Sequence, residues 1–292
     1  MQFANPFKQK GLWLKGNTHT HTRASDGTLT VTEIGQTYKR HDYDFVFLTD
    51  HWTRTVPPVG LPAKPLLIPA EELDFWLDDN MYHVVCLGLR REWKPKVCRS
   101  WNALRRQALR EKALLILAHP YWSGNRLEPV LSARLFTAVE VYNGVCDGLN
   151  AKGCGNAFWD DMLHAGQCLT GIATDDMHWR PNVAQGWIMV KAKARTAASI
   201  LDAIRRGCFY STQGPEIRDI IVRGRRVEVT CSPAQRINFV SNRWNGNVQK
   251  AGRRPLTRAA WEAIKGVTYA RVEIVDRQGR TAWSNPVFFN KK

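Results

Sequence analysis

Six of the eight histidines in the 292-residue sequence stand where short apolar runs meet polar residues. His19 and His21 are two residues apart in HTHTRASD, so on an extended strand both imidazoles project from one face and can bind one ion. Asp26 follows on the adjoining turn. Imidazole nitrogens combined with carboxylate oxygens suit Zn, Mn or Fe, whereas Mg and Ca prefer oxygen alone. These residue types therefore indicate a site for Zn, Mn or Fe.

Histidine, usually with a carboxylate close by, recurs at four other places in the sequence. The residues are Asp50 and His51 in TDH, His83 after PAEELD, His119 in AHP, and Asp176 and His178 in TDDMH. A single histidine at a strand end is usually only a hydrogen-bonding residue, and we interpret His41 and His164 in that way. The whole set exceeds the needs of one tetrahedral ion. The sequence thus predicts a cluster of two to three divalent ions.

These side chains need secondary-structure elements whose ends meet in space. The alternation of β-rich runs with segments of helical composition predicts parallel β/α units and a barrel. In a parallel barrel the C-terminal ends of all strands face one rim, where active sites are built. Thr30 and Ser100 are suitable helix caps. We expect strands over residues 12–21, 44–51, 83–89, 113–120, 138–143 and 171–176, and helices over residues 30–40, 100–112 and 197–206.

The character of the sequence changes near residue 214. Beyond it, short β-rich runs are separated by Gly, Pro, Asn and basic residues, which predicts a small antiparallel sheet or sandwich. Residues 256–265 are the one segment there with helical composition. We therefore expect a barrel over residues 1–214 and a β domain over residues 215–292.

Length and composition describe a globular protein. At roughly 150 residues per domain, the chain is long enough for two domains or for a barrel with an appendage. The sequence is 44% hydrophobic and 23% charged, which argues against disorder, collagen and coiled coil. Its seven cysteines lack CxxC spacing and are expected to be reduced thiols. Without an apolar signal segment or a run of about 20 apolar residues, the expected location is the cytoplasm, with no membrane partner.

A net charge of +16 favours anionic partners. Residues 215–292 contain 16 basic and 6 acidic side chains and so carry +10 of this charge. The clusters RGRR and GRRP could follow a nucleic-acid backbone, as in a nuclease or a noncatalytic binding protein. Solvated strand faces and turns explain the same arginines, and no RNP motif accompanies them. A nucleic-acid partner is therefore the less favoured alternative, and the oligomeric state is left open.

The order and spacing of the motifs resemble the polymerase and histidinol phosphatase (PHP) family of metal-dependent phosphoesterases. The matching segments are HTHTRASDG, FLTDH, IPAEEL, HVVCLGL, LAHPY, VEVYNG and ATDDMH, between residues 16 and 178. FYSTQGPEI and AWSNPVF resemble the small β domain of the carbaryl-hydrolase-like branch of this family. The resemblance implies an α/β fold, with a distorted (β/α)7-type barrel followed by a small, sandwich-like, all-β C-terminal domain.

The same resemblance implies a ligand set for three ions. Glu72 is preferred to Glu71 because it stands where the family has its bridging acid, and Asp176 is preferred to Asp175 because it completes DxH. Glu71 and Asp175 then become supporting or surface residues. The nine implied ligands, which are also the predicted catalytic residues, are His19, His21, Glu72 and Asp176 for the first ion, His83 and His119 with Glu72 as the bridge for the second, and Asp26, His51 and His178 for the third.

This set of ligands predicts a hydrolase that uses a metal-activated hydroxide. Hydrolysis of a phosphate ester requires lowering the barrier by ~20 kcal/mol or more, which no single general base supplies. Ions about 3.5–4 Å apart activate a shared water and hold the phosphoryl oxygens. No GxSxG, Walker or GxGxxG motif offers a competing mechanism. We expect a small phosphomonoester or phosphodiester as substrate, aryl or nucleotide-like, with a carboxyl or carbamate ester as the alternative.

Further residues beside the ligands are candidates for substrate contact. The tryptophans would form a wall for a flat aromatic group or nucleobase, although Trp is abundant here and also packs under loops. The arginines would clamp phosphate, and the polar pair from VEVYNG would orient ligands or touch substrate. The basic loop residues Lys94, Lys96 and Arg99 are a candidate mobile lid. The predicted substrate contacts are Arg23, Trp52, Trp122, Glu140, Asn143, Trp179 and Arg180.

Overall fold

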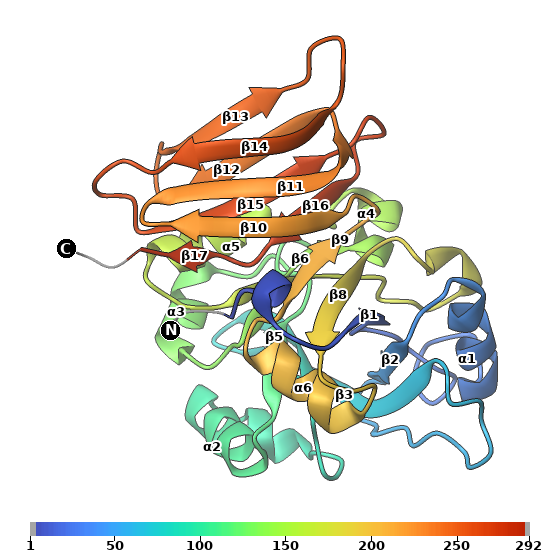
Figure 1. Cartoon of the computed structure of the whole chain (residues 1–292). Helices are drawn as coiled ribbons and strands as arrows, with labels where there is room; N and C mark the ends of the chain where they lie inside the picture. The colour runs from blue at the N-terminus through green and yellow to red at the C-terminus, as the bar shows by residue number, and fades with distance from the viewer. Residues whose placement is uncertain (1–3, 290–292) are drawn as a thin grey trace.

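The computed structural model describes residues 4–289, and Figure 1 shows its two parts, an α/β part below and a layered β part above. Within these residues, consecutive strands of the α/β part pair side by side from β1 to β7. An isolated bridge between Thr20 and Met177 joins the chain beyond β1 to the chain beyond β7. The strands are β1 (Leu12–Asn17), β2 (Phe45–Leu48), β3 (Leu66–Leu77), β4 (Asn80–Leu87), β5 (Leu114–Leu117), β6 (Ala138–Asn143) and β7 (Thr170–Thr174).

Asn17 supplies the side chain that fastens the two end strands together. Its Oδ1 accepts hydrogen bonds from Thr174 Oγ1 at 2.7 Å and from Asp175 N at 3.0 Å. Its Nδ2 donates to His19 O at 2.7 Å and to Tyr38 Oη at 2.7 Å. The strands from β1 to β7 therefore form a ring in which β1 and β7 meet through side chains and single bridges instead of a regular ladder.

The expectation that all strands of the ring run parallel is wrong for β4. This strand is antiparallel to both β3 and β5, whereas β1–β2–β3 and β5–β6–β7 pair in parallel. Only Asp78 and Asp79 separate β3 from β4, and both have positive φ, as a tight hairpin turn requires. Two residues cannot form a parallel crossover. His83 consequently reaches the rim from the N-terminal half of its strand.

The helices expected over residues 30–40, 100–112 and 197–206 are confirmed. Thr30 caps the first of them in a capping box with Glu33, and Ser100 caps the second by accepting from Ala103 N at 3.2 Å. No helix within residues 4–289 is long and apolar enough to cross a membrane. The α-helices of the described chain are α1 (Val31–Arg40), α2 (Trp101–Glu111), α3 (Leu127–Ala133), α4 (Gly144–Asn150), α5 (Asn156–His164) and α6 (Ala197–Arg205), with 3₁₀ turns η1 (Pro6–Lys8), η2 (Pro95–Cys98) and η3 (Arg180–Asn182).

The inside of the ring is filled by side chains. Phe47, Ile68, Val85, Ile116 and Ile172 belong to one buried cluster. A ring packed in this way is a core and not a pore, so chemistry must take place at its ends.

The main sheet continues from the ring into the C-terminal part. Strand β1 pairs with β8, β8 with β9, and β9 with β16, all antiparallel. Hydrogen-bonded strands thus cross the position of the boundary expected at residues 214 and 215, and the division into two domains there stays a prediction. The strands of this region are β8 (Trp187–Ala192), β9 (Phe209–Thr212), β10 (Ile217–Arg223), β11 (Arg226–Ala234), β12 (Arg236–Ser241), β13 (Gly246–Lys250), β14 (Leu256–Glu262), β15 (Tyr269–Val275), β16 (Thr281–Ser284) and β17 (Val287–Phe288).

The C-terminal part is layered, as the orange and red strands of Figure 1 show. Strands β10, β11 and β14 form a second sheet, which packs on β12, β15 and β16 through Val229, Phe239 and Ile274. The helix expected over residues 256–265 is wrong, because residues 256–262 form β14. Pairing with β11 satisfies the backbone of this segment, and Ala259 turns into the core, so tertiary context overrides helical composition.

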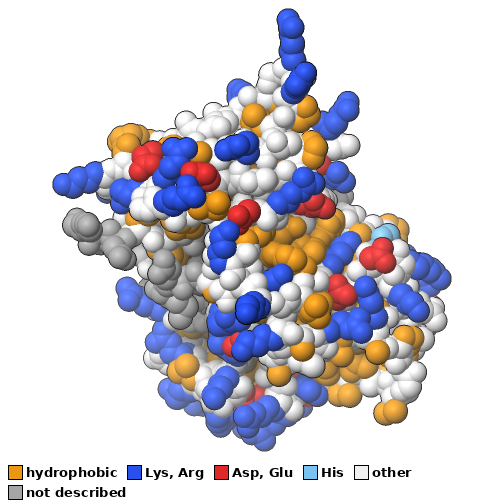
Figure 2. Space-filling model, viewed as in Figure 1, with side chains coloured by type: hydrophobic (Ala, Val, Ile, Leu, Met, Phe, Trp, Pro, Cys, Tyr) orange, Lys and Arg blue, Asp and Glu red, His pale blue; other side chains and the backbone are white. Residues whose placement is uncertain are grey.

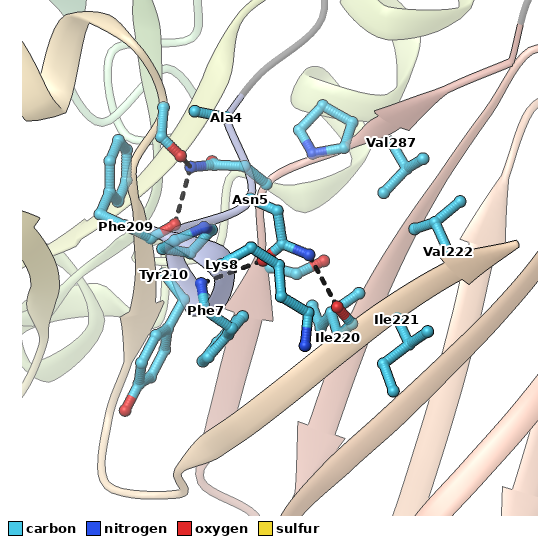
Figure 3. Close-up of a pocket in the computed structure, with 15 residues that line it drawn as sticks. Ala4, Asn5, Phe7, Lys8, Phe209, Tyr210, Ile220, Ile221, Val222 and Val287 are labelled. Carbon is cyan, nitrogen blue, oxygen red and sulfur yellow. Dashed lines mark hydrogen bonds between the residues drawn. The ribbon is translucent and has the colours of Figure 1, made fainter. Parts of the chain in front are cut away.

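Several contacts join the C-terminal strands to the rest of the chain, among them an ion pair of Arg271 and a hydrogen bond from Asn5. Arg271 of β15 is buried, and its Nη2 lies 2.5 Å from Asp160 Oδ2 of α5. On the face of the molecule seen in Figure 2, hydrophobic side chains gather near the middle, among Lys and Arg side chains. The N-terminal segment contacts β10, and Asn5 Nδ2 donates to Ile220 O at 2.7 Å, as Figure 3 shows. Between them lies an apolar space of about 240 Å³, which we call the junction cavity.

Candidate metal centre

The nine side chains predicted as ligands converge at one place. Five come from the chain just beyond β1, β2, β5 and β7, one from the turn after His21, and two from within β3 and β4, which run in opposite directions. His178 completes the group two residues after Asp176. Each of the nine has a nitrogen or oxygen within 3.4 Å of a partner of opposite type among the nine.

Glu72 lies at the centre of this group, and its two oxygens face different imidazoles. Oε2 is 3.1 Å from His19 Nε2 and 3.2 Å from His21 Nε2. Oε1 is 3.0 Å from His83 Nδ1 and 3.4 Å from His119 Nε2. A carboxylate with this arrangement has the geometry needed to bridge two ions, since each oxygen faces at least two imidazole nitrogens that could bind the same ion once their protons are displaced.

Asp176 closes the same group from the opposite side. Its Oδ1 lies 3.2 Å from His19 Nε2 and 3.3 Å from His21 Nε2. Within residues 4–289 this oxygen is buried and has no hydrogen-bond partner of good geometry. A buried, unsatisfied carboxylate oxygen is costly, and a shared cation would satisfy it together with the two nitrogens. His19, His21 and Glu72 form one group of donor atoms close enough to hold a metal ion.

Asp26, His178 and His51 extend the cluster toward solvent. Asp26 Oδ2 is 3.2 Å from His178 Nε2, and Asp26 Oδ1 is 3.2 Å from His21 Nδ1. His51 Nε2 lies 3.4 Å from Glu72 Oε2 and 3.7 Å from Asp26 Oδ2, so it stands between the two groups. The donor atoms of His21, Asp26 and His178 also lie close enough for one ion, as do those of His51, Glu72 and His83.

In the cluster, imidazoles that favour their protonated form lie between buried carboxylates. Burial disfavours the charged imidazole of His19, but the carboxylates of Asp176 and Glu72 outweigh it and raise the pKa well above 6.5. In the same way, burial is outweighed at Glu72, whose pKa the neighbouring histidines His19 and His83 hold well below its usual range. Protons on the imidazoles therefore neutralise the carboxylates when no metal is bound, and metal binding would displace them.

Glu140 holds two of the histidines from behind. Its Oε1 is 2.8 Å from His19 Nδ1, and its Oε2 accepts from His119 N at 2.9 Å and from Asn143 Nδ2 at 2.8 Å. Asn143 Nδ2 also donates to Asp176 Oδ2 at 3.1 Å. Glu140 and Asn143 are buried beneath the candidate ligands and do not border the cavity described below. They orient the cluster, in the manner of the carboxylates that support metal-bound histidines.

Two supporting residues were missed by the sequence analysis. Asp74 Oδ1 lies 3.0 Å from His51 Nδ1, and Ser123 Oγ lies 3.0 Å from His119 Nδ1. The position of Asp74, two residues after Glu72 on a strand, places both side chains on the same face and could have revealed it. Ser123 lies four residues after His119 in a turn, and no pattern in the sequence indicates that contact.

Asp50, which the sequence analysis named only as the neighbour of His51, accepts hydrogen bonds from the loop after β1. Its Oδ1 accepts from Thr22 N at 2.7 Å and from Ser25 Oγ at 2.7 Å. These bonds hold the loop that carries Asp26.

Glu71 and Asp175, the carboxylates not chosen as ligands, are both fully buried, so their interpretation as surface residues is wrong. Both Glu71 oxygens accept from Trp93 N, at 3.2 and 3.1 Å, and burial raises the pKa of this carboxyl to about 7. Asp175 accepts from Gln185 N at 2.8 Å and from Tyr38 Oη at 3.0 Å, and burial raises its pKa to about 6. Because neighbouring residues point in opposite directions, each faces away from the cluster.

The cluster opens into a cavity of about 250 Å³, which we call the metal cavity. Two of the predicted substrate contacts, Trp122 and Trp179, border it. Trp52 does not, because it packs on the core and its Nε1 donates to Asp74 O at 3.2 Å. The residues that line the metal cavity are Asp26, His51, Glu72, His83, His119, Trp122, Val145, Cys146, Leu149, Asp176, His178 and Trp179.

The basic residues predicted near the substrate lie outside this lining. Arg23 Nε donates to Thr28 O at 2.8 Å, and Arg180 Nη2 is 3.4 Å from Glu33 Oε1. Both guanidinium groups are thus engaged on the outer surface. The lid candidates Lys94, Lys96 and Arg99 also lie outside the lining, at η2 and its ends.

No protein-family model matches the sequence, and no curated protein does. Solved structures match the fold. A two-domain protein from Bacteroides vulgatus containing a predicted PHP-like metal-dependent phosphoesterase is 16% identical, with 94% of each chain covered and a TM-score of 0.53. The lesion-specific endonuclease EndoQ from Pyrococcus furiosus is 15% identical over 66% of this chain and 56% of its own, with a TM-score of 0.47. The first of these shows that the chain shares the fold of that protein over nearly the whole length of both chains.

Proposed function

We propose that the protein is a metal-dependent phosphoesterase of the PHP family, with the distorted (β/α)7-type barrel over residues 1–214 and the β domain of the carbaryl-hydrolase-like branch over residues 215–292. Its substrate is a small phosphomonoester or phosphodiester, and its expected location is the cytoplasm. One observation carries this proposal, namely that the two oxygens of the buried Glu72 face separate sets of imidazoles, three at Oε2 and two at Oε1.

Two to three ions of Mn, Fe or Zn would occupy the cluster. When bound, such ions lower the pKa of a coordinated water and stabilise charge on the phosphoryl oxygens. The assignment keeps Glu72 as the bridge between the first two sites. The first would be held by His19, His21, Glu72 and Asp176, the second by Glu72, His83 and His119, and the third by Asp26, His51 and His178.

The surrounding residues prepare the histidines for this role. Glu140 Oε1 lies 2.8 Å from His19 Nδ1, which leaves Nε2, facing Glu72 and Asp176, as the nitrogen that would bind an ion once its proton is displaced. Asp74 Oδ1 lies 3.0 Å from His51 Nδ1 without a hydrogen bond of good geometry, and His51 Nε2 faces the cluster. These carboxylates orient the imidazoles before substrate arrives.

The lining of the metal cavity supports a requirement for cations in substrate binding as well as in chemistry. Among residues 4–289, three carboxylates and no lysine or arginine line it. A phosphate group would be repelled by Asp26, Glu72 and Asp176 unless positive charge stood between. Without metal, protonated imidazoles only neutralise these carboxylates, whereas bound divalent ions add a net positive charge. The metal-free protein should therefore bind phosphate esters more weakly than the metal-loaded protein.

The absence of lysine and arginine from the described lining also favours a second candidate. A carboxyl or carbamate ester carries no charge before reaction, and it would enter such a cavity without a guanidinium partner. The same metal-activated water would attack its carbonyl carbon.

The test combines metal analysis with a substrate panel. Elemental analysis of the purified protein should find two to three equivalents of Mn, Fe or Zn. Aryl phosphates, bis-aryl phosphates, nucleotides and aryl carbamates are then assayed with and without chelator. Phosphate-ester hydrolysis that the chelator abolishes supports the proposal, and hydrolysis of carbamates alone establishes the second candidate instead.

A variant of His83 tests the second ion. His83→Ala should abolish hydrolysis and leave the circular-dichroism spectrum unchanged. His164→Ala, at the exposed end of α5, is the matched control and should retain activity. Full turnover by the His83 variant would contradict the assigned site.

A further inference from the structure

The metal cavity has two unlike walls. One consists of the candidate ligands, and the other is apolar. The apolar side chains come from three separate segments, the turn after β5, helix α4 and the chain beyond β7, and are Trp122, Val145, Cys146, Leu149 and Trp179.

Trp122 stands against the histidines of the second proposed site. Its ring centroid is 5.0 Å from that of His119 at 78° and 5.8 Å from that of His83 at 84°. The turn that presents it is closed by Ser123 N donating to His119 O at 3.1 Å and by Asn125 N donating to Pro120 O at 2.9 Å. Although 39% of Trp122 is exposed, its position is therefore set by the turn and by the two imidazoles.

Trp179 occupies the corresponding place beside the outer group of ligands. Its ring centroid is 5.9 Å from that of His178, and 37% of the residue is exposed. Hydrogen bonds from Thr28 N to His178 O at 2.7 Å and from Asn182 N to Trp179 O at 2.9 Å hold the backbone on both sides. Indole surfaces therefore flank both the inner and the outer ends of the ligand cluster.

Helix α4 adds aliphatic surface to this wall. Val145 and Leu149 are four residues apart and so lie on one face of the helix. Val145 is buried, whereas 61% of Leu149 is exposed, which is unusual for a leucine bordering a cavity. Apolar surface left open at the mouth of a polar site marks a place where a ligand is buried.

Charge narrows the kind of phosphate ester that fits. Arg23 and Arg180 are engaged elsewhere, and no lysine or arginine of the described residues lines the metal cavity. A phosphomonoester brings two negative charges and only one organic group. A phosphodiester brings one charge and two organic groups, of which one can cover the apolar wall.

Building on the proposed function, we infer that the metal cavity selects a phosphodiester with one negative charge and at least one aryl or similarly apolar ester group. Trp122, Trp179 and Leu149 determine this specificity. In the reaction, the oxygen of water bonds to phosphorus and the bond from phosphorus to the aryl oxygen breaks. One proton of water ends on the released phenol, and the other is shed by the phosphomonoester product.

Binding of two anions that contain no ester bond tests the inference directly. Diphenylphosphinate and dimethylphosphinate carry the same single charge and differ in their apolar groups, which are joined to phosphorus through carbon and cannot be hydrolysed. Calorimetric titration of the Mn²⁺-loaded protein should give a Kd for diphenylphosphinate at least about tenfold lower than that for dimethylphosphinate, because ring-on-ring contacts add to apolar burial. Equal affinities would overturn the inference.

Substitutions test whether the two tryptophans of the apolar wall cause the preference for aryl groups. Trp122→Ala and Trp179→Ala should each lower the ratio of the two affinities by roughly two- to tenfold and leave the Kd of dimethylphosphinate unchanged. Trp244→Ala, which removes a tryptophan that is 83% exposed and outside the lining, is the control and should keep the full ratio. A ratio unchanged in both cavity variants, with the fold intact by circular dichroism, would overturn the assignment of these residues.

The rates of hydrolysis of a phosphodiester and a phosphomonoester distinguish a failure of this inference from a failure of the proposed function. Bis(p-nitrophenyl) phosphate should be hydrolysed with a higher kcat/KM than p-nitrophenyl phosphate, which has the same leaving group but one more charge. If the monoester is the better substrate, the phosphoesterase proposal stands and the inference fails. If the metal-loaded protein hydrolyses neither ester, the proposed function fails. The ratio of the two affinities then still tests whether the apolar wall binds aryl groups.

Discussion

Two cavities of the molecule have nearly the same volume, about 250 Å³ for the metal cavity and about 240 Å³ for the junction cavity. Their linings differ completely. The junction cavity is bordered mainly by apolar side chains such as Phe7, Phe209, Ile220 and Val222, and Figure 3 shows them around the N-terminal segment. The metal cavity combines imidazoles, carboxylates and indoles. Volume alone therefore does not identify a functional site, whereas the chemistry of the buried groups does.

The difference also concerns stability. At the junction cavity, apolar burial and the hydrogen bond from Asn5 to Ile220 O attach the N-terminal segment to β10. At the metal cavity, carboxylates such as Glu72 and Asp176 are buried close together, which opposes folding unless positive charge compensates them. Changes at the first cavity should alter stability, and changes at the second should alter metal binding and activity.

The largest effect is expected for Glu72→Gln. The amide cannot supply two anionic oxygens to the two sets of imidazoles, so we expect the loss of at least ~100-fold of activity and of much of the bound metal. Even outer partners of metal ligands contribute 10- to 100-fold. Elemental analysis and kcat/KM measure this. A variant that retains full metal content would remove Glu72 from the bridging position.

Glu140→Gln should have a smaller effect of the same kind. The substitution keeps the shape but weakens the bond to His19 Nδ1, and we expect metal affinity to fall by about 10- to 100-fold. Competition with a chromophoric chelator gives the affinity. If affinity is unchanged, Glu140 has only a structural role.

Ile220→Ala tests the junction cavity. In contrast to the two variants above, it should lower stability and leave metal binding and activity unchanged. Ile220 is 6% exposed and borders existing empty space, so the free energy of unfolding should fall by about 2 kcal/mol, the low end for such a truncation. Urea denaturation measures the loss, while metal content and kcat/KM should stay unchanged. Loss of activity in the folded variant would contradict the separation of the two cavities.

The smallest effect is a pH dependence that metal should reverse. Folding raises the pKa of His19, His21 and His83 above 6.5, so the stability that they contribute is fully present below about pH 6.5 and is lost as pH rises through the raised values. In chelator, the Tm should therefore fall with rising pH, by about 2–4 °C for each kcal/mol lost. With Mn²⁺ it should rise instead, because displaced protons no longer compete. Parallel pH dependences in chelator and in Mn²⁺ would argue against metal at these residues.

The sequence by itself determined those features that depend on local chemistry. Thr30 and Glu33 form a capping box within one turn of helix, so α1 begins where the pattern predicts. Most of the histidines and carboxylates of the cluster were recognisable because each stands where a run of buried strand residues meets polar ones. Such signals need no knowledge of distant contacts.

Tertiary structure alone decided how these parts meet. Residues 256–262 became β14 because β11 offered a partner for their backbone, and β4 reversed direction because its connection to β3 is only two residues long. It also decided that Trp122 and Leu149 border the metal cavity while Trp52, Arg23 and Arg180 do not. The physical reason is that strand pairing, cavity lining and electrostatic neighbours are set by residues far apart in the chain, whose proximity exists only after folding.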